Sequence, residues 1–304
     1  GTGTAHYAVS TDGRTTWSVA KGTDGVRPIV RNNSGTWQYN SESSTTTTTD
    51  AISTSTLTDT FNFKTGGASI ATERNIRTFF NNDGTRLYVY SYNNTDMVSY
   101  GLSTAYDMST KGTHLQRVDF SGGIYGFSSG FGPIWNNNGT KLYYPTHSTI
   151  MELAVSTAYD LSTISGTASH TITVANRVGQ LAGLVFKPDG TKMYVVEDAG
   201  QGSGGGGQIH TYTLSTAYDL STASFTSVTA DNYFTHSGAR FTSFAFADSG
   251  STIYILDRLN DKIRRYSLAT AWDVTNATYL GTSYDIALTG GPSNDPCSIT
   301  IDNN

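Results

Sequence analysis

The sequence predicts an all-β protein, a β-propeller of about five, possibly six, four-stranded antiparallel blades. Two phrases that recur in step and a strand-forming composition lead to this prediction. The first phrase, Ser-Thr-Ala-Tyr-Asp, begins at Ser103, Ser156 and Ser215, and a diverged copy, Ala-Thr-Ala-Trp-Asp, begins at Ala269. The copies start 53, 59 and 54 residues apart. A period near 50 residues indicates one supersecondary unit stacked on copies of itself.

The second phrase precedes each copy of the first and contains a tight turn. It occupies residues Asn82–Val89, Asn137–Tyr144, Pro188–Val195 and Asp248–Ile255. In the third of these, Asp-Gly supplies the positive φ that a two-residue hairpin needs. The composition agrees, because Tyr (19 residues) and Thr favour strands and Gly (32 residues) marks turns.

The third copy shows how four strands fit into one repeat. Leu181–Phe186 is a short apolar run typical of a buried strand, and Lys187–Gly190 is the turn. Lys192–Glu197 and Gln208–Leu214 are the second and third strands, and Ser224–Thr229 is the fourth. Four short antiparallel strands make one propeller blade.

The other copies follow the same register. First strands are expected at Ile76–Phe80, Gly132–Trp135 and Phe241–Phe246, and fourth strands at His114–Phe120, His170–Ala175 and Thr278–Ile286. Because Phe80, Trp135, Phe186 and Phe246 end their first strands just before the turn, we expect all four to be buried between sheets.

The chain divides into an irregular N-terminal part, residues 1–56, and the propeller repeats, residues 57–304. Thr16–Lys21 is expected to be a strand, Val26–Arg31 and Thr36–Asn40 to form a hairpin, and Leu57–Phe63 to be a fourth strand. The Thr-rich stretch before residue 57 is an overgrown loop or a linker. The N-terminal part is therefore either a divergent, closing blade or a separate attachment module.

Both ends of the sequence fit a shared blade. Cys297–Asn304 looks like a first strand that stops at its turn, and Gly1–Val9 reads like its continuation. Such closure would hide the sheet edges; truncation of a longer chain is the alternative, and the missing initial Met suggests a processed or truncated start. The glycine-rich residues Gly200–Gly207 are expected to be mobile or held by a neighbouring subunit.

Composition excludes several function classes. A net charge of −5 with 14% charged residues disfavours nucleic acid as a partner. No apolar run reaches the length of a membrane span, and the single cysteine, Cys297, excludes an internal disulfide framework.

No catalytic, cofactor-binding or metal-binding residue is assigned from sequence. Gly126–Gly130 has the spacing of a nucleophile elbow, but a strand follows where a helix is needed. The six histidines show no metal-ligand spacing, although distant blades could still bring catalytic residues together. The repeated Tyr or Trp is interpreted as a structural wedge between blades and the repeated Asp as a partner of backbone amides; four equivalent ligand-binding tyrosines are the alternative.

Pro188–Val195 resembles the repeat of YVTN-type β-propellers. Together with the Ser-Thr-Ala-Tyr-Asp-Leu-Ser-Thr loop, it resembles repeat proteins of marine phage tails and bacterial surfaces, and residues 1–40 are similar to segments of phage tail and fibre proteins. Lactonase-type propellers also carry YVTN-like repeats, but their catalytic and metal positions have no match in this sequence.

The resemblance implies a non-enzymatic virion structural or tail protein that uses its propeller for assembly and adhesion. The expected partners are other virion or surface-assembly subunits, copies of itself in a homo-oligomer, and host cell-surface glycans. The expected location is the virion or the cell exterior. The alternatives are a secreted bacterial or archaeal surface or filament subunit, and a propeller hydrolase of the lactonase type.

Overall fold

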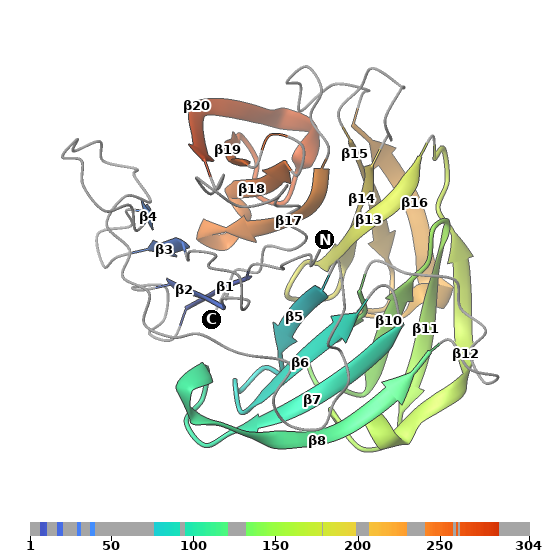
Figure 1. Ribbon diagram of the computed structural model, residues 1–304. Coiled ribbons are helices and arrows are strands. Elements are labelled where there is room, and N and C mark those ends of the chain that lie inside the picture. Colours follow the sequence, from blue (N-terminus) through green and yellow to red (C-terminus); the bar gives the residue numbers. More distant parts are fainter. Residues whose placement is uncertain are drawn as a thin grey trace.

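The computed structural model contains four complete four-stranded antiparallel sheets among the residues it describes. These residues are 76–91, 95–120, 132–177, 179–198, 207–229, 241–257, 260 and 262–285, together with the backbone of four short N-terminal strands. The sheets are arranged around a common centre as the blades of a propeller (Figure 1). The all-β propeller prediction is therefore confirmed.

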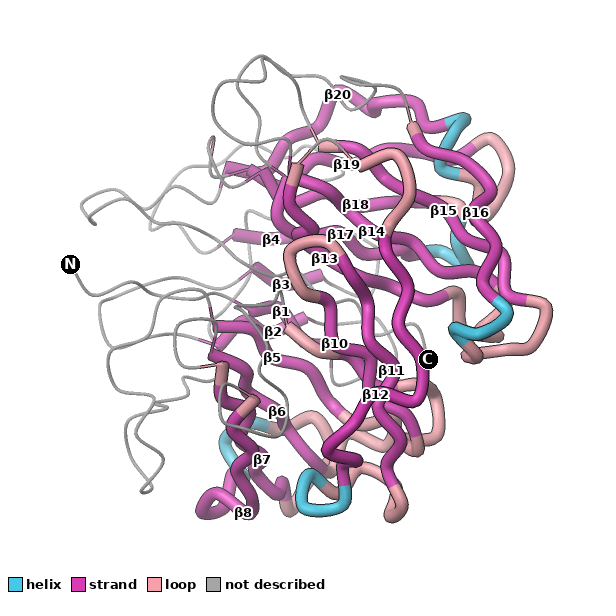
Figure 2. Tube along the Cα trace, turned by 90° about the vertical axis from the view of Figure 1, so that its right-hand side faces the viewer, coloured by secondary structure: helices cyan, strands magenta, loops and turns pink. Residues whose placement is uncertain are grey.

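Each blade runs from its innermost to its outermost strand in chain order. The strands of the four blades are β5 (Ile76–Phe80), β6 (Arg86–Ser91), β7 (Asp96–Leu102) and β8 (Lys111–Asp119); β9 (Ile134–Trp135), β10 (Lys141–Pro145), β11 (Thr149–Val155) and β12 (Ile164–Thr173); β13 (Gln180–Phe186), β14 (Lys192–Asp198), β15 (Gln208–Leu214) and β16 (Ala223–Val228); and β17 (Phe241–Ala247), β18 (Thr252–Asp257), β19 (Lys262–Leu268) and β20 (Ala277–Asp285). Figure 2 shows β8 and β12 on the outside of the molecule.

Among the described residues, helical structure is limited to single 3₁₀ turns. Four of them, η1 (Met108–Thr110), η2 (Leu161–Thr163), η3 (Leu220–Thr222) and η5 (Val274–Asn276), lie between the third and fourth strands of a blade. A fifth, η4 (Asp248–Gly250), replaces the hairpin turn of the fourth blade, whose sequence lacks the Asp-Gly pair.

The predicted fifth blade does not appear as a four-stranded sheet among the described residues. The N-terminal part forms two separate hairpins instead, β1 (Tyr7–Ser10) with β2 (Trp17–Ala20) and β3 (Ile29–Arg31) with β4 (Trp37–Tyr39). Both views place these strands between the fourth and first blades (Figures 1 and 2). The predicted strand Leu57–Phe63, the C-terminal half-blade and residues 200–206 of the glycine-rich loop lie outside the described residues.

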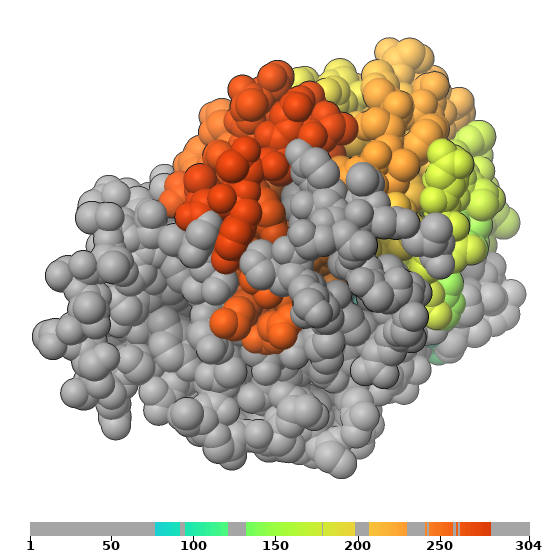
Figure 3. All heavy atoms as spheres, turned by 90° about the horizontal axis from the view of Figure 1, so that it is seen from above, coloured from blue at the N-terminus to red at the C-terminus, as the bar shows by residue number. Residues whose placement is uncertain are grey.

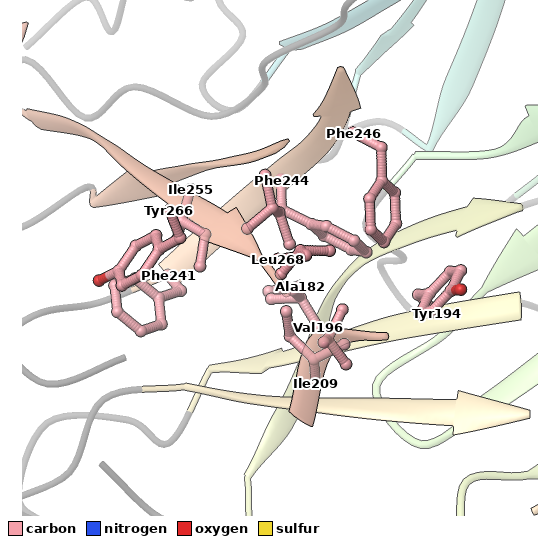
Figure 4. Packing of buried hydrophobic residues seen from close by; sticks show 12 residues of the cluster. Ala182, Tyr194, Val196, Ile209, Phe241, Phe244, Phe246, Ile255, Tyr266 and Leu268 are labelled. Atoms are coloured by element: carbon pink, nitrogen blue, oxygen red, sulfur yellow. The ribbon is translucent and has the colours of Figure 1, made fainter. Parts of the chain in front are cut away.

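The core consists of apolar layers between neighbouring blades. At the junction of the third and fourth blades, Val196 and Ile209 share one buried cluster with Phe244, and Phe246 packs on the ring of Tyr194 (Figure 4). In the space-filling view from above, the fourth blade lies beside the third (Figure 3). Burying each such side chain contributes roughly 1.5–3 kcal/mol, which lets the protein fold without disulfides.

The prediction for the four first-strand aromatics is correct for two of them. Phe246 and Trp135 are buried, with 1% and 9% of their surface exposed, whereas Phe80 and Phe186 are half-buried. All four contact the aromatic ring of their own blade's recurring loop. Phe80 and Phe186 are less buried than Phe246, which belongs to the buried cluster between the third and fourth blades.

Candidate functional site

The two recurring phrases meet at one edge of every blade, called here the repeat face. It consists of the turns around Gly84, Gly139, Gly190 and Gly250 and the loops around Tyr106, Tyr159, Tyr218 and Trp272. In the third blade, the Tyr218 amide donates to the Gly190 carbonyl at 3.0 Å, and the Tyr218 hydroxyl donates to the Pro188 carbonyl at 2.6 Å. The ring covers Gly190 so closely that a Cβ there would overlap it.

The repeat face also joins neighbouring blades. The Tyr143 hydroxyl of the second blade donates to the Tyr218 carbonyl of the third at 2.5 Å, and Lys141 Nζ donates to the same oxygen at 2.9 Å. The other two junctions between described blades repeat this pair of bonds, with Arg86 and Tyr88 on the Tyr159 carbonyl and Lys192 and Tyr194 on the Trp272 carbonyl. The recurring Tyr and Trp are therefore structural, as interpreted from the sequence.

The opposite edge of each blade, the variable face, differs from blade to blade. It holds the connections between second and third strands and the starts of the first strands. Seven residues after the turn glycine, each blade has a buried polar residue at or just beyond the end of its second strand: Ser91, Thr146, Glu197 or Asp257. Because blades of one fold do not need four different polar groups at one position, the variable face is the better place for function.

Glu197 and His210 form a buried pair at this face in the third blade. Glu197 lies on β14 and His210 on β15, and neither has exposed surface. His210 Nε2 and Glu197 Oε2 are 2.7 Å apart. His210 Nδ1 is buried and has no hydrogen-bond partner, and such an atom commonly marks a bound water or a functional contact.

Two further acid–base pairs lie at the same face. In the fourth blade, Arg264 donates through Nε and Nη2 to Asp257 Oδ2, at 3.1 and 2.7 Å. In the first blade, Asp96 pairs with the partly exposed Arg117. Burial raises the pKa of the Asp96 carboxyl, although Arg117 opposes this effect. The second blade has a hydroxyl pair instead, Thr146 and Thr149, 2.8 Å apart.

Arg77 brings a charge to the centre of the ring at this face. It lies on β5, the innermost strand of the first blade, and its Nη2 donates to the Ala182 carbonyl on β13, the innermost strand of the third. The second blade separates these two in the chain, so this bond crosses the inside of the ring. The Arg77 side chain is half-buried, which leaves part of it accessible.

The Arg77 contact is adjacent to the Glu197–His210 pair. Leu181, the residue before Ala182, pairs with Glu197 across β13 and β14, and Val195, two residues earlier on β14, pairs with His210. Neighbouring strands are about 4.8 Å apart, so the three groups form a path from the ring centre outward. β15, which carries His210, is two strand spacings, about 10 Å, from β13. A substrate bound between them would have a cation to stabilise developing negative charge and an imidazole to move a proton.

Sequence reasoning did not assign these residues. His210 was noted only as one of six histidines without metal spacing, and His6 and His236 lie outside the described residues. A signal was nevertheless present, because aligning the repeats on the turn glycine brings Glu197 and Asp257 into register with Ser91 and Thr146. Within the described ranges, no three His, Cys, Asp or Glu side chains gather as a metal site, and no helix is long and apolar enough to cross a membrane.

Comparisons with known proteins give only distant likenesses. No family model matches the chain, and no curated protein matches it. Among solved structures, a Bacteroides fragilis protein named as a candidate 6-phosphogluconolactonase is 11% identical, with a TM-score of 0.47 over 95% of this chain and 71% of its own. A periplasmic gluconolactonase from Pseudomonas aeruginosa is 14% identical, with a TM-score of 0.42 over 92% of this chain and 69% of its own.

These comparisons correct the functional prediction. Three of the similar structures are named as lactonases, two of them as candidates; this contradicts the prediction of a non-enzymatic virion, tail or adhesion protein and agrees better with the hydrolase alternative. No finding supports the expected phage link. At 11–14% identity the likeness does not transfer an activity to this chain. The predicted homo-oligomer, glycan contact and extracellular location stay predictions.

Proposed function

We propose that the protein is a hydrolase of ester or lactone bonds and that it acts at the centre of the variable face. One observation carries the proposal: Arg77 donates across the ring to the Ala182 carbonyl. The residue before Ala182 is the strand partner of Glu197, and the Glu197 carboxylate contacts the His210 ring. The site thus combines a partly accessible cation with a carboxylate–histidine pair, although these residues come from two non-adjacent blades.

In the proposed reaction, water attacks the substrate carbonyl while the imidazole of His210 takes a proton from it. The Glu197 carboxylate orients the ring through Nε2 and stabilises the imidazolium that forms. Because His210 has no exposed surface, Nδ1 is expected to act through a water rather than to contact the substrate.

Arg77 completes the reaction at the carbonyl. Its guanidinium donates hydrogen bonds to the oxyanion that develops when water adds. The carbon–oxygen bond to the leaving alkoxide then breaks, and the alkoxide takes the proton back from the imidazolium. The products are a carboxylic acid and an alcohol, which are one molecule when the substrate is a lactone.

The test is hydrolysis by the purified chain of five- and six-membered lactones and p-nitrophenyl acetate. Glu197→Gln and His210→Gln keep the side-chain size, and each is expected to lower kcat by roughly 10²–10⁴-fold. The matched control replaces the equivalent pair of the fourth blade by apolar residues, Asp257→Leu with Arg264→Met, since such replacement of a buried ion pair is often tolerated. This control is expected to retain activity.

Two results would overturn the proposal. One is a folded wild-type chain that hydrolyses none of these substrates. The other is activity that survives both Glu197→Gln and His210→Gln, which would place the chemistry elsewhere.

A further inference from the structure

Gly132 lies two residues before the first residue of β9, at the start of the second blade, and is buried. Its φ of +81° is in the left-handed region that glycine adopts readily. A Cβ at this position would overlap the Cδ of Arg77 and lie 3.2 Å from the Cβ and Cγ of Arg77. The aliphatic part of the Arg77 side chain therefore packs directly against Gly132.

The other end of Arg77 is held by an irregularity in the third blade. The pairing of β13 with β14 is interrupted between Leu181 and Gly183, so that Ala182 is the extra residue of a β-bulge. β5 pairs with β6 without interruption. A bulge removes its extra residue from the regular ladder, and the Ala182 carbonyl accepts from Arg77.

We infer that Gly132 is a positioning residue for Arg77 in the proposed reaction, an inference that rests on the proposed function. The second blade supports the stem, the third blade accepts from the guanidinium, and the first blade supplies the residue itself. An arginine side chain has several rotatable bonds, and fixing them in advance is what makes a donor effective on a developing charge. A side chain at position 132 would displace the stem and move the guanidinium.

Gly132→Ala also introduces backbone strain at a positive φ, so a single variant cannot separate the two effects. The test is therefore a double-mutant cycle of Gly132→Ala and Arg77→Ala, measured both by kinetics and by urea unfolding. Backbone strain is present in both backgrounds, whereas the clash requires the Arg77 side chain. Gly112→Ala on β8, where the nearest atom is 3.7 Å from the added Cβ, is the matched control.

We expect Gly132→Ala to lower kcat about as much as Arg77→Ala does, with KM changed less than about threefold. In the Arg77→Ala background, Gly132→Ala should lower kcat no further, and it should shift the urea midpoint less than it does in the wild-type background. Gly112→Ala should keep wild-type kcat.

The inference is overturned if Gly132→Ala keeps wild-type kcat while Arg77→Ala loses it. It is also overturned if Gly132→Ala shifts the urea midpoint equally in both backgrounds. If the wild-type chain is inactive, the proposed function fails, and the unfolding cycle still reports separately whether Gly132 and Arg77 are coupled.

Discussion

The hydroxyls of Tyr88, Tyr143 and Tyr194 each donate a hydrogen bond to a backbone carbonyl of the next blade, at 2.5–2.6 Å. Burial raises the pKa of all three hydroxyls, so they remain protonated donors in ordinary buffers. The second donor to each carbonyl is less uniform. Lys141 Nζ is 2.9 Å from the Tyr218 carbonyl, whereas Lys192 Nζ is 3.4 Å from the Trp272 carbonyl.

This difference predicts that Tyr194→Phe destabilises the protein more than Tyr143→Phe. Removing one hydrogen bond of this kind costs about 1 kcal/mol, and more if the partner is left unsatisfied. We expect about 1 kcal/mol for Tyr143→Phe, because Lys141 still donates, and up to about 2–3 kcal/mol for Tyr194→Phe. Urea unfolding of both variants measures this, and equal losses would contradict it.

The aspartates of the repeat face predict how stability depends on pH. Hydrogen bonds from Ser162, Ser221 and Thr275 lower the pKa of Asp160, Asp219 and Asp273 below 3.8. Burial opposes the shift at Asp189, but bonds from Lys187 and Thr191 lower its pKa to about 2. A lowered carboxyl pKa contributes stability above the unfolded value, and this stability is lost as pH falls through the folded value.

The melting temperature should therefore fall as the pH is lowered from about 4 to about 2. Replacing Asp160, Asp219 and Asp273 together by Asn should lower stability at pH 7 and flatten this acid slope. Thermal melts at several pH values test the prediction, and an unchanged slope in the triple variant would refute it.

At the scale of the element, the third blade shows why sequence predicted the strands well. Gln208–Leu214 is β15 without a shift, and Leu181–Phe186 differs from β13 by one residue. Repetition made this possible, because four copies of one turn fix where the strands begin. The repeated Asp of the loop was predicted to be a partner of backbone amides, and Asp219 accordingly caps the 3₁₀ turn by accepting from the Ser221 amide.

The turn and the loop predict the effect of Gly190→Ala. Gly190 has a φ of +71°, and an added Cβ would overlap the Tyr218 ring. The backbone alone costs about 1–2 kcal/mol, and displacing the ring adds to this, so we expect a loss of at least about 2 kcal/mol. Gly112→Ala, whose added Cβ would make only an ordinary contact of 3.7 Å with the Gly101 carbonyl oxygen, should change stability by less than about 1 kcal/mol; similar losses for both would contradict the packing argument.

The candidate site could not be predicted in the same way. Arg77 and Ala182 are 105 residues apart, and nothing repeated marks either of them. Their contact depends on which strands face the centre of the ring and on a bulge that the apolar pattern of Leu181–Phe186 does not reveal. Only Glu197 had a signal, as a charged residue where the first two repeats have Ser91 and Thr146.

At the scale of the whole molecule, the ring has four described blades and an N-terminal part whose role is still a prediction. Val89, Val98 and Tyr100 of the first blade are fully buried, with at most 1% exposed, yet none belongs to the apolar clusters at the three described junctions. Strands β1–β4 lie on the open side of this blade (Figure 1). We propose from this that the N-terminal part is a closing blade; the separate attachment module is the alternative.

We therefore predict that deleting residues 1–56 destabilises the entire propeller. The apolar face of the first blade would lose its cover, and the edge of the ring would open. Urea unfolding of the truncated chain should show a lower midpoint or no cooperative transition. A truncated chain as stable as the full one would support the attachment module instead.

The functional prediction rested on a resemblance of the recurring phrases and of residues 1–40, and neither of these contains the candidate site at the variable face. The measurement that tests the central claim most directly is the rate of lactone hydrolysis by Arg77→Met, which keeps the aliphatic stem and removes the charge. The account predicts a folded variant whose kcat is lower by roughly 10²–10³-fold. A kcat equal to that of the wild-type chain would contradict it.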